Sequence, residues 1–279
     1  MKTYPVVEIT FSPTGGTKKV ADLISCYLGN ITNTVNLIRH DVSFSDVTVP
    51  SDSLAVIAAP VFEGVIPDIA IERMKEIQGN HANCVVIAVY GNRAYDDGLI
   101  QLKDTAELCG FNVIASVAAV AEHSIMRQFG SGRPDEEDSK ELKKFAEEIL
   151  EKLSSDKELS TDYFVPGSHE YKRLGNLNVV PKASASCTGC GKCADACPTG
   201  AINKNNQNGF KGHPPGAEIL SESRAYMDLS RNARRVIAGP PDRQLSGIGE
   251  RAEMLPEPRR RNAGRCPAGK CRRIAAGAG

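Results

Sequence analysis

The stretch "YPVVEITFSPTGGTKKVADLISCYL", residues 4–28, decides the fold class. Residues 4–11 are rich in β-branched and other apolar side chains, which is typical of a strand. The turn "SPTGG" follows, and the apolar residues after it recur at helical spacing: Val20, Leu23, Ile24 and Leu28. A strand, a tight turn and a helix in this order form the first half of a β–α–β unit.

The same alternation continues to residue 153. Two runs, 53–60 and 83–90, are almost wholly apolar, as expected of strands that are buried on both faces. The pattern predicts an α/β fold, a doubly wound parallel sheet of five strands. Further strands are expected at 34–38 and 111–121, and further helices at 67–78, 97–110 and 133–153.

Composition places the chain among ordinary globular proteins. It has 279 residues, of which 41% are apolar and 24% are charged. No apolar run approaches the roughly 18 residues of a membrane-spanning helix. The N-terminus lacks the long apolar stretch and the small-residue cleavage site of a signal peptide. We therefore expect a cytoplasmic protein without membrane attachment.

A second motif, "CTGCGKCADACPTGAI", occupies residues 187–202. Thiolates are the ligands of iron–sulfur clusters, and this spacing with a trailing proline, Pro198, is typical of bacterial-type sites. Zinc is the second possibility, but four cysteines within eleven residues fit it less well. The candidate metal ligands are Cys187, Cys190, Cys193 and Cys197.

The remaining cysteines indicate a reduced protein. The total of nine is odd, and four are clustered, which argues against a disulfide framework. Cys26, Cys84 and Cys109 lie among apolar neighbours, so we expect them to be small buried side chains. No nucleophile motif of the form G-x-S-x-G and no metal-spaced histidine pair occurs, so we expect no catalytic residues.

The turn after the first strand is a candidate phosphate loop. Its small residues let backbone N–H groups converge on an anion, and the following helix adds positive potential. The loop does not match G-x-G-x-x-G or end in G-K-[S/T], which disfavours a dinucleotide or nucleoside-triphosphate site. A turn that binds nothing is the alternative. The candidate phosphate ligands are Ser12, Thr14, Gly15, Gly16 and Thr17.

The pattern S-x-T-G-x-T resembles the FMN-phosphate loop of flavodoxins. "PVFEGVIP" (60–67) and "YGNRAYDD" (90–97) are similar to the loops that flank the flavin ring in that family. The resemblance implies FMN, with Phe62 and Tyr95 as candidate stacking aromatics. "EHS" (122–124) is open to two readings, a place near the same crevice or an ordinary polar strand end. The implied ring-side residues are Pro60, Val61, Phe62, Glu63, Gly64, Tyr90, Gly91, Asn92, Arg93 and Tyr95.

Together the two motifs resemble the fused flavodoxin–ferredoxin electron-transfer proteins of anaerobes, over residues 1 to about 208. The resemblance implies FMN and a [4Fe–4S] cluster. It also implies a second cysteine run that would normally supply a ligand to the first cluster, and this run is missing from the sequence. The fourth ligand therefore stays open between Cys197, Cys266 and a labile cluster with no such ligand.

The last 70 residues differ in kind from the rest. Residues 1–209 contain 20 Lys+Arg and 27 Asp+Glu, whereas residues 210–279 contain 14 and 7, with arginine replacing lysine. Their few, scattered apolar residues predict disorder. We hypothesise that this tail is not native ferredoxin sequence but follows a frameshift or a joint near Gln207. The rival, a basic arm for nucleic acid, is disfavoured because seven acids interrupt the arginines.

The sequence thus divides into four parts: a flavodoxin-like domain (1–153), a linker (154–184), a partial ferredoxin segment (185–208) and the tail (209–279). The expected function is transfer of single electrons between FMN and a [4Fe–4S] cluster, with redox proteins as partners. An enzyme that reduces a small substrate at the flavin, with the cluster as electron inlet, is the alternative. A binding module with neither cofactor is the third hypothesis.

Overall fold

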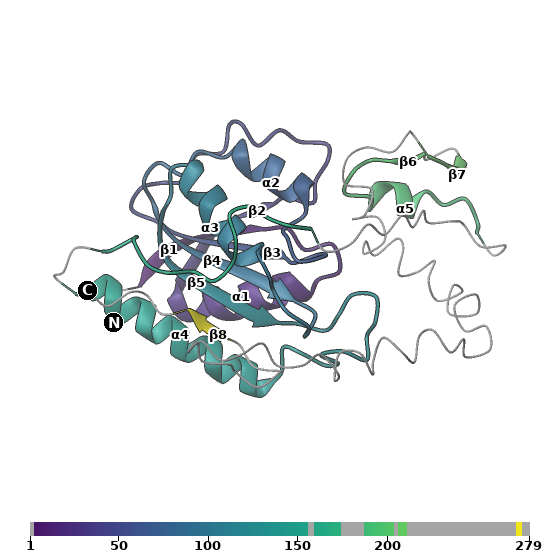
Figure 1. Cartoon of the computed structure of the whole chain (residues 1–279). Helices are drawn as coiled ribbons and strands as arrows, with labels where there is room; N and C mark the ends of the chain where they lie inside the picture. Colours follow the sequence, from purple (N-terminus) through teal and green to yellow (C-terminus); the bar gives the residue numbers. More distant parts are fainter. Residues whose placement is uncertain (1–2, 156–158, 174–186, 204–205, 211–271, 275–279) are drawn as a thin grey trace.

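The structure is a computed structural model of the whole chain. It describes residues 3–155, 159–173, 187–203, 206–210 and 272–274, and of the last two ranges only the backbone (Figure 1). The hypotheses about the tail therefore lie, apart from 209–210 and 272–274, outside the described residues.

Five parallel strands form the centre of the sheet, in the order β2-β1-β3-β4-β5. This 2-1-3-4-5 order is that of flavodoxin-like doubly wound folds, which confirms the expected fold class. A sixth strand, β8 (Arg272–Ile274), pairs antiparallel with β5 at the sheet edge and was not predicted. The parallel strands are β1 (Tyr4–Thr10), β2 (Gly29–Asn36), β3 (Leu54–Pro60), β4 (Asn83–Tyr90) and β5 (Asn112–Val120).

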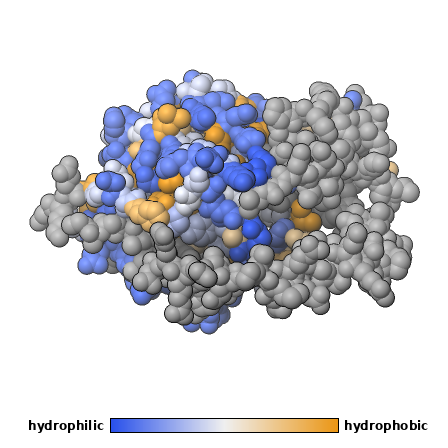
Figure 2. Space-filling view, in the orientation of Figure 1, coloured by the Kyte–Doolittle hydropathy of each residue, from blue (hydrophilic) through white to orange (hydrophobic). Residues whose placement is uncertain are grey.

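Helices cover both faces of this sheet (Figure 1). The pair α1 (Gly16–Leu28) and α4 (Glu136–Ser154) encloses one apolar core, and α2 (Asp68–Lys75) with α3 (Gly98–Leu108) encloses the other. The view in Figure 2 shows hydrophobic residues in small groups among hydrophilic ones. In the described part of the chain, no helix is long and apolar enough to cross a membrane.

Helix α4 starts three residues later than its sequence pattern predicted, because the preceding residues cap it. The Asp135 carboxylate accepts hydrogen bonds from the backbone N–H groups of Glu137 and Asp138, at 2.9 and 3.1 Å. In return the Asp138 carboxylate accepts from the Asp135 N–H at 2.9 Å, which completes a capping box. Arg133 Nε also donates to Asp138, at 2.7 Å.

One of the three cysteines expected to be buried is exposed, so that prediction was wrong. Cys26 lies on α1, where Ile24, Ser25 and Leu28 face the sheet, and the helical repeat turns position 26 to solvent. Cys84 is buried as expected. Cys109 is half-buried at the end of α3, with its Sγ 3.2 Å from the Met74 carbonyl oxygen.

About half of the expected linker packs against the sheet and α3. Residues 159–173, here called the strap, run back over α3, with Tyr163 and Val165 buried in the core. The Tyr163 hydroxyl lies 2.8 Å from Ser116 Oγ on β5. Lys103 and Lys152 place their ammonium groups 5.5 and 5.6 Å from the centre of the Tyr163 ring. The strap therefore packs against the sheet.

The strap ends beside the loop that follows β3. Asp97 accepts hydrogen bonds from the backbone N–H groups of Ser168 and Lys172, at 2.8 and 2.9 Å. Arg173 Nη2 then lies 2.9 Å from an Asp68 carboxylate oxygen, at the first residue of α2. The chain thus leaves the domain close to residues 60–67.

The segment with four cysteines is small. It contains α5 (Lys192–Asp195) and an antiparallel pair of strands, β6 (Ile202–Asn203) and β7 (Asn206–Phe210). Its apolar centre consists of Ala194, Cys197, Ala201 and Ile202. Arg73 on α2 connects the segment to the sheet domain, because its Nη2 donates to the Pro198 carbonyl oxygen at 2.6 Å.

Candidate cofactor sites

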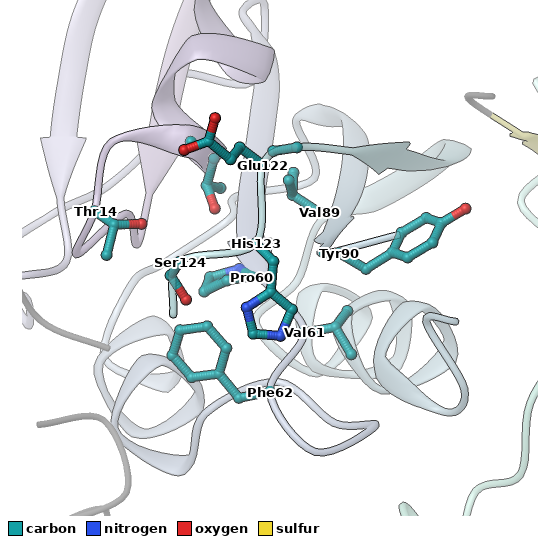
Figure 3. A pocket seen from close by; sticks show the side chains of 13 residues that line it. Thr14, Pro60, Val61, Phe62, Val89, Tyr90, Glu122, His123 and Ser124 are labelled. Carbon is teal, nitrogen blue, oxygen red and sulfur yellow. The ribbon is translucent and has the colours of Figure 1, made fainter. Parts of the chain in front are cut away.

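An open recess lies at the carboxyl ends of β1, β3, β4 and β5 (Figure 3). It takes in about 370 Å³ of space, open solvent at its mouth included. Strands β1 and β3 are neighbours at the point where the strand order reverses, which is where doubly wound sheets bind ligands. The lining residues are Thr14, Gly16, Thr17, Pro60, Val61, Phe62, Val89, Tyr90, Gly91, Ala121, Glu122, His123 and Ser124.

One end of the recess is suited to an anion. Gly15, the N-cap of α1, has a left-handed backbone (φ +90°) and no side chain of its own to cap the helix, and the first turn contains no acidic residue. The Lys18 N–H donates to Ser12 Oγ at 2.9 Å, which closes the loop. Within the described residues, the hydroxyls of Thr14 and Thr17 have no protein hydrogen-bond partner. These hydroxyls and the first N–H groups of α1 fit a phosphate group.

Lys18, which follows this loop, is already paired with two acids. Lys18 Nζ lies 2.9 Å from an oxygen of Glu8, which is fully buried on β1, and it also contacts Asp22. Hydrogen bonds and charge from Asp22 and Glu8 raise the pKa of Lys18 although burial opposes them. Lys18 is therefore committed to these acids, whereas the charge of Lys19 acts on Glu122 in the wall of the recess.

The other end of the recess is apolar and aromatic. Val61, Phe62 and Tyr90 line it, and the Phe62 N–H donates to the Val65 carbonyl oxygen at 2.8 Å, which holds the loop in a tight turn. Packing leaves no room at Gly98, where a Cβ would lie 2.7 Å from a Val61 methyl group. Such a wall suits a flat aromatic ligand.

The structure brings together eight of the fifteen predicted flavin-site residues. Tyr95 is not among the lining residues; it packs edge-on against Tyr90, with ring centres 5.7 Å apart. Arg93 pairs with Asp96. Asn92 has a left-handed backbone (φ +70°), and its buried Oδ1 has no partner in the described structure. The predicted residues that do not line the recess are Ser12, Gly15, Glu63, Gly64, Asn92, Arg93 and Tyr95.

The strand-end residues that the sequence left open do line the recess, together with Val89 and Ala121, which were missed. Their position directly after β5 was the available signal. The Glu122 carboxylate accepts from the Gly132 N–H at 3.0 Å and pairs with Arg127, and both contacts lower its pKa. Burial lowers the pKa of His123.

The four candidate metal ligands differ in environment. Cys187 and Cys190 are exposed, Cys193 is half-buried, and Cys197 is enclosed, with its Sγ 3.3 Å from Thr199 Oγ1. The pKa of Cys190 is lowered, first by a hydrogen bond from the Lys192 backbone and then by one from the Thr188 side chain. Burial raises the pKa of Cys193.

No three Cys, His, Asp or Glu side chains of the described residues are gathered as a metal site. The thiol donor set nevertheless suits an iron–sulfur cluster, and N–H groups directed at sulfur favour such ligands.

Comparisons with known proteins address both parts of the chain. Residues 183–203 match the family model of the 4Fe-4S binding domain. No curated protein sequence matches the chain.

Among solved structures, flavodoxin 1 from Bacillus cereus is 18% identical and covers 54% of this chain and 99% of its own, with a TM-score of 0.38. A flavodoxin from Streptococcus pneumonia TIGR4 is 21% identical over 53% and 99%, with a TM-score of 0.36. Rubredoxin oxygen:oxidoreductase from Desulfovibrio gigas is 14% identical over 55% and 38%, with a TM-score of 0.37. Because these identities and TM-scores are low, the assignment of the fold depends on the strand order of the sheet itself.

The described chain thus combines a parallel sheet in the 2-1-3-4-5 strand order with a segment that matches the 4Fe-4S binding domain, and the two motifs predicted this combination. The matched family model is that of a domain that binds a 4Fe-4S cluster, the metal cofactor that the cysteine motif predicted.

Proposed function

We propose that the protein carries single electrons between FMN, bound in the recess, and a [4Fe–4S] cluster, bound by the cysteine segment. The recess carries the proposal, because it joins an anion-binding loop to an aromatic wall at the switch point of the sheet. The match to a 4Fe-4S binding domain in the same chain supplies the second half.

The residues of the recess have distinct tasks in this proposal. Thr14, Thr17 and the first N–H groups of α1 would hold the phosphate. Phe62 and Tyr90 would cover the flavin ring and keep water from it. FMN supplies the electron chemistry, and the protein orients it and tunes it through contacts and burial.

In the cysteine segment, Cys187, Cys190 and Cys193 are the proposed ligands, with Cys197 as fourth ligand. Cys266 is the alternative fourth ligand and lies outside the described residues. We also propose that residues 1–173 form the flavin-binding part, since the strap packs on the sheet.

Anaerobic reconstitution of the full chain tests both halves separately. We expect about one FMN and about four irons with matching sulfide per chain. A Cys187→Ala/Cys190→Ala variant should lose the iron and keep the flavin, whereas Cys26→Ala, an exposed cysteine outside the motif, should keep both. Failure to bind FMN would contradict the flavin site. FMN without iron would contradict the cluster.

A turnover assay distinguishes a carrier from an enzyme. With a reduced donor, a carrier should exchange electrons with redox proteins and leave quinones and nitro compounds nearly unchanged. Sustained reduction of those small molecules would instead identify a flavin-dependent reductase.

A further inference from the structure

His123 is held rigidly at the edge of the recess. Figure 3 shows its imidazole ring, which follows β5, projecting between the side chains of Val61 and Phe62. Its backbone N–H donates to the Phe129 carbonyl oxygen at 3.0 Å, so the main chain is also fixed. The ring is therefore part of the wall that faces a ligand.

One ring nitrogen is committed to the backbone. The N–H groups of Ile125 and Met126 both donate to Nδ1 of His123, each at 3.2 Å. A nitrogen that accepts N–H donors carries no proton, so the proton of the neutral ring lies on Nε2. Burial of the ring lowers its pKa, which also favours the neutral form at pH 7.

Packing prevents the ring from turning. A Cβ added at Gly91 would lie 2.6 Å from Cδ2 of His123 and 2.9 Å from its Cβ and Cγ. The backbone of Gly91 thus lies directly against one side of the ring, at a distance that only glycine permits. With Nδ1 held by two N–H groups and Cδ2 against Gly91, the Nε2 edge is left for the recess.

We propose that His123 is a ligand-binding residue that presents a fixed Nε2–H donor to the ring of the molecule in the recess. The inference rests on the proposed flavin function and adds a selectivity rule to it. Within the described residues, Nε2 has no protein hydrogen-bond partner, so the donor is available. A planar heterocycle with a hydrogen-bond acceptor at its edge would accept from this Nε2–H group. A ring without an acceptor would leave the N–H group unpaired, which would weaken its binding.

The tautomer can be measured without any flavin. Nitrogen-15 NMR of the flavin-free protein at pH 7 should show His123 with an unprotonated Nδ1 and a protonated Nε2. A charged imidazolium, or a proton on Nδ1, would overturn the inference whether or not FMN binds.

Two substitutions separate the donor from the loop contact. His123→Asn keeps an acceptor near the position of Nδ1 but removes the donor, and we expect about three- to tenfold weaker binding of both FMN and riboflavin. His123→Gln keeps a donor near the position of Nε2 and should bind within about twofold of the parent protein. Gly91→Ala should weaken binding at least as much as His123→Asn, because its methyl group displaces the ring.

If His123→Asn and the parent protein bind FMN with equal affinity, His123 only holds the loop, and the inference is overturned. The proposed FMN site would still stand. Failure of the parent protein itself to bind FMN would overturn the proposed function and the ligand role together. Thermal unfolding of each variant checks that a loss of binding is not a loss of folding.

Discussion

At the end of the recess that is suited to a phosphate group, the hydroxyls of Thr14 and Thr17 lie where other phosphate sites often have a lysine or arginine. The described lining residues include no lysine or arginine, and Lys18 is turned to Glu8. Such a loop recognises its ligand by hydrogen-bond geometry more than by net charge. Its contribution should therefore depend on whether the ligand carries a phosphate.

Thr14→Val should weaken FMN binding about tenfold or more, since a hydrogen bond to a charged group contributes roughly 1.5–3 kcal/mol. Riboflavin has no phosphate, and its affinity should not change. Titration of the flavin-free protein with both ligands provides the measurement, and Thr34→Val, on the exposed strand β2, is the matched control. Equal losses for the two ligands would show that Thr14 does not contact the phosphate.

Lys18→Met should destabilise the fold. The variant leaves the fully buried carboxylate of Glu8 without the ammonium group that now lies 2.9 Å away. Breaking a buried pair in this way costs about 3–5 kcal/mol, and the 41% exposure of the Lys18 side chain places the expected loss at or below the lower end, about 2–3 kcal/mol.

Urea unfolding gives the loss of stability directly. Lys19→Met, one residue along the helix, is the control, and adding Glu8→Gln to Lys18→Met should recover part of the loss. An unchanged unfolding midpoint for Lys18→Met would mean that the Lys18–Glu8 pair does not stabilise the fold.

Among the elements, those with a strong periodic pattern were predictable and those held by single contacts were not. The buried strands β3 and β4 were found from their apolar runs. Strand β2 was placed late and short, because it lies at the sheet edge and only Val35 of its residues is buried. The strap carries too few buried residues to show a period, and polar contacts such as Asp97 with Ser168 fix it.

The residues of the recess likewise divide into those that a local motif predicts and those that only tertiary contacts place. Its phosphate loop and the loop after β3 were predicted from local motifs, and both line it. The place of His123 depends on Gly91 and on the amides of Ile125 and Met126, which no sequence pattern connects.

The cap of α4 makes a prediction about pH. The N–H of Asp138 is the largest cause that lowers the pKa of Asp135 below its ordinary range. A carboxyl whose pKa is lowered on folding stabilises the fold above its unfolded pKa, about 4, and loses this contribution as the pH falls through the folded value.

Asp135→Ala should therefore lower the free energy of unfolding by about 1 kcal/mol at pH 7 and by much less near pH 2. Urea unfolding of both proteins across this range measures the difference, with Lys140→Ala on the same helix as control. A difference that is independent of pH would contradict the capping role of the charged carboxylate.

At the scale of the whole molecule, Arg73 connects the sheet domain and the cysteine segment. Its Nη1 donates to the carbonyl oxygens of Leu37 and Ile38, at 2.6 and 3.0 Å, while its Nη2 donates to that of Pro198. Burial lowers the pKa of this half-buried guanidinium. A single planar group thus holds the turn after β2 and the residue that follows the last cysteine of the motif.

Arg73→Lys should loosen this connection, because an ammonium group has no flat fork with which to reach three carbonyl groups. We expect hydrogen exchange of the backbone amides in residues 192–203 to rise roughly tenfold, as for the loss of one charged hydrogen bond. FMN affinity should not change. Arg39→Lys, an exposed arginine that pairs with Asp41, is the control. Unchanged exchange would show that the segment is held by other contacts.

The strap also sets the reach of the cysteine segment. Because residues 159–173 are packed on the sheet, only 13 residues separate Arg173 from Cys187, where the sequence alone suggested about thirty. A chain of that length spans at most roughly 50 Å, so the two cofactor sites meet at a high effective concentration set by the tether. Electron exchange between them should then be first-order, with a rate that does not change when the protein is diluted.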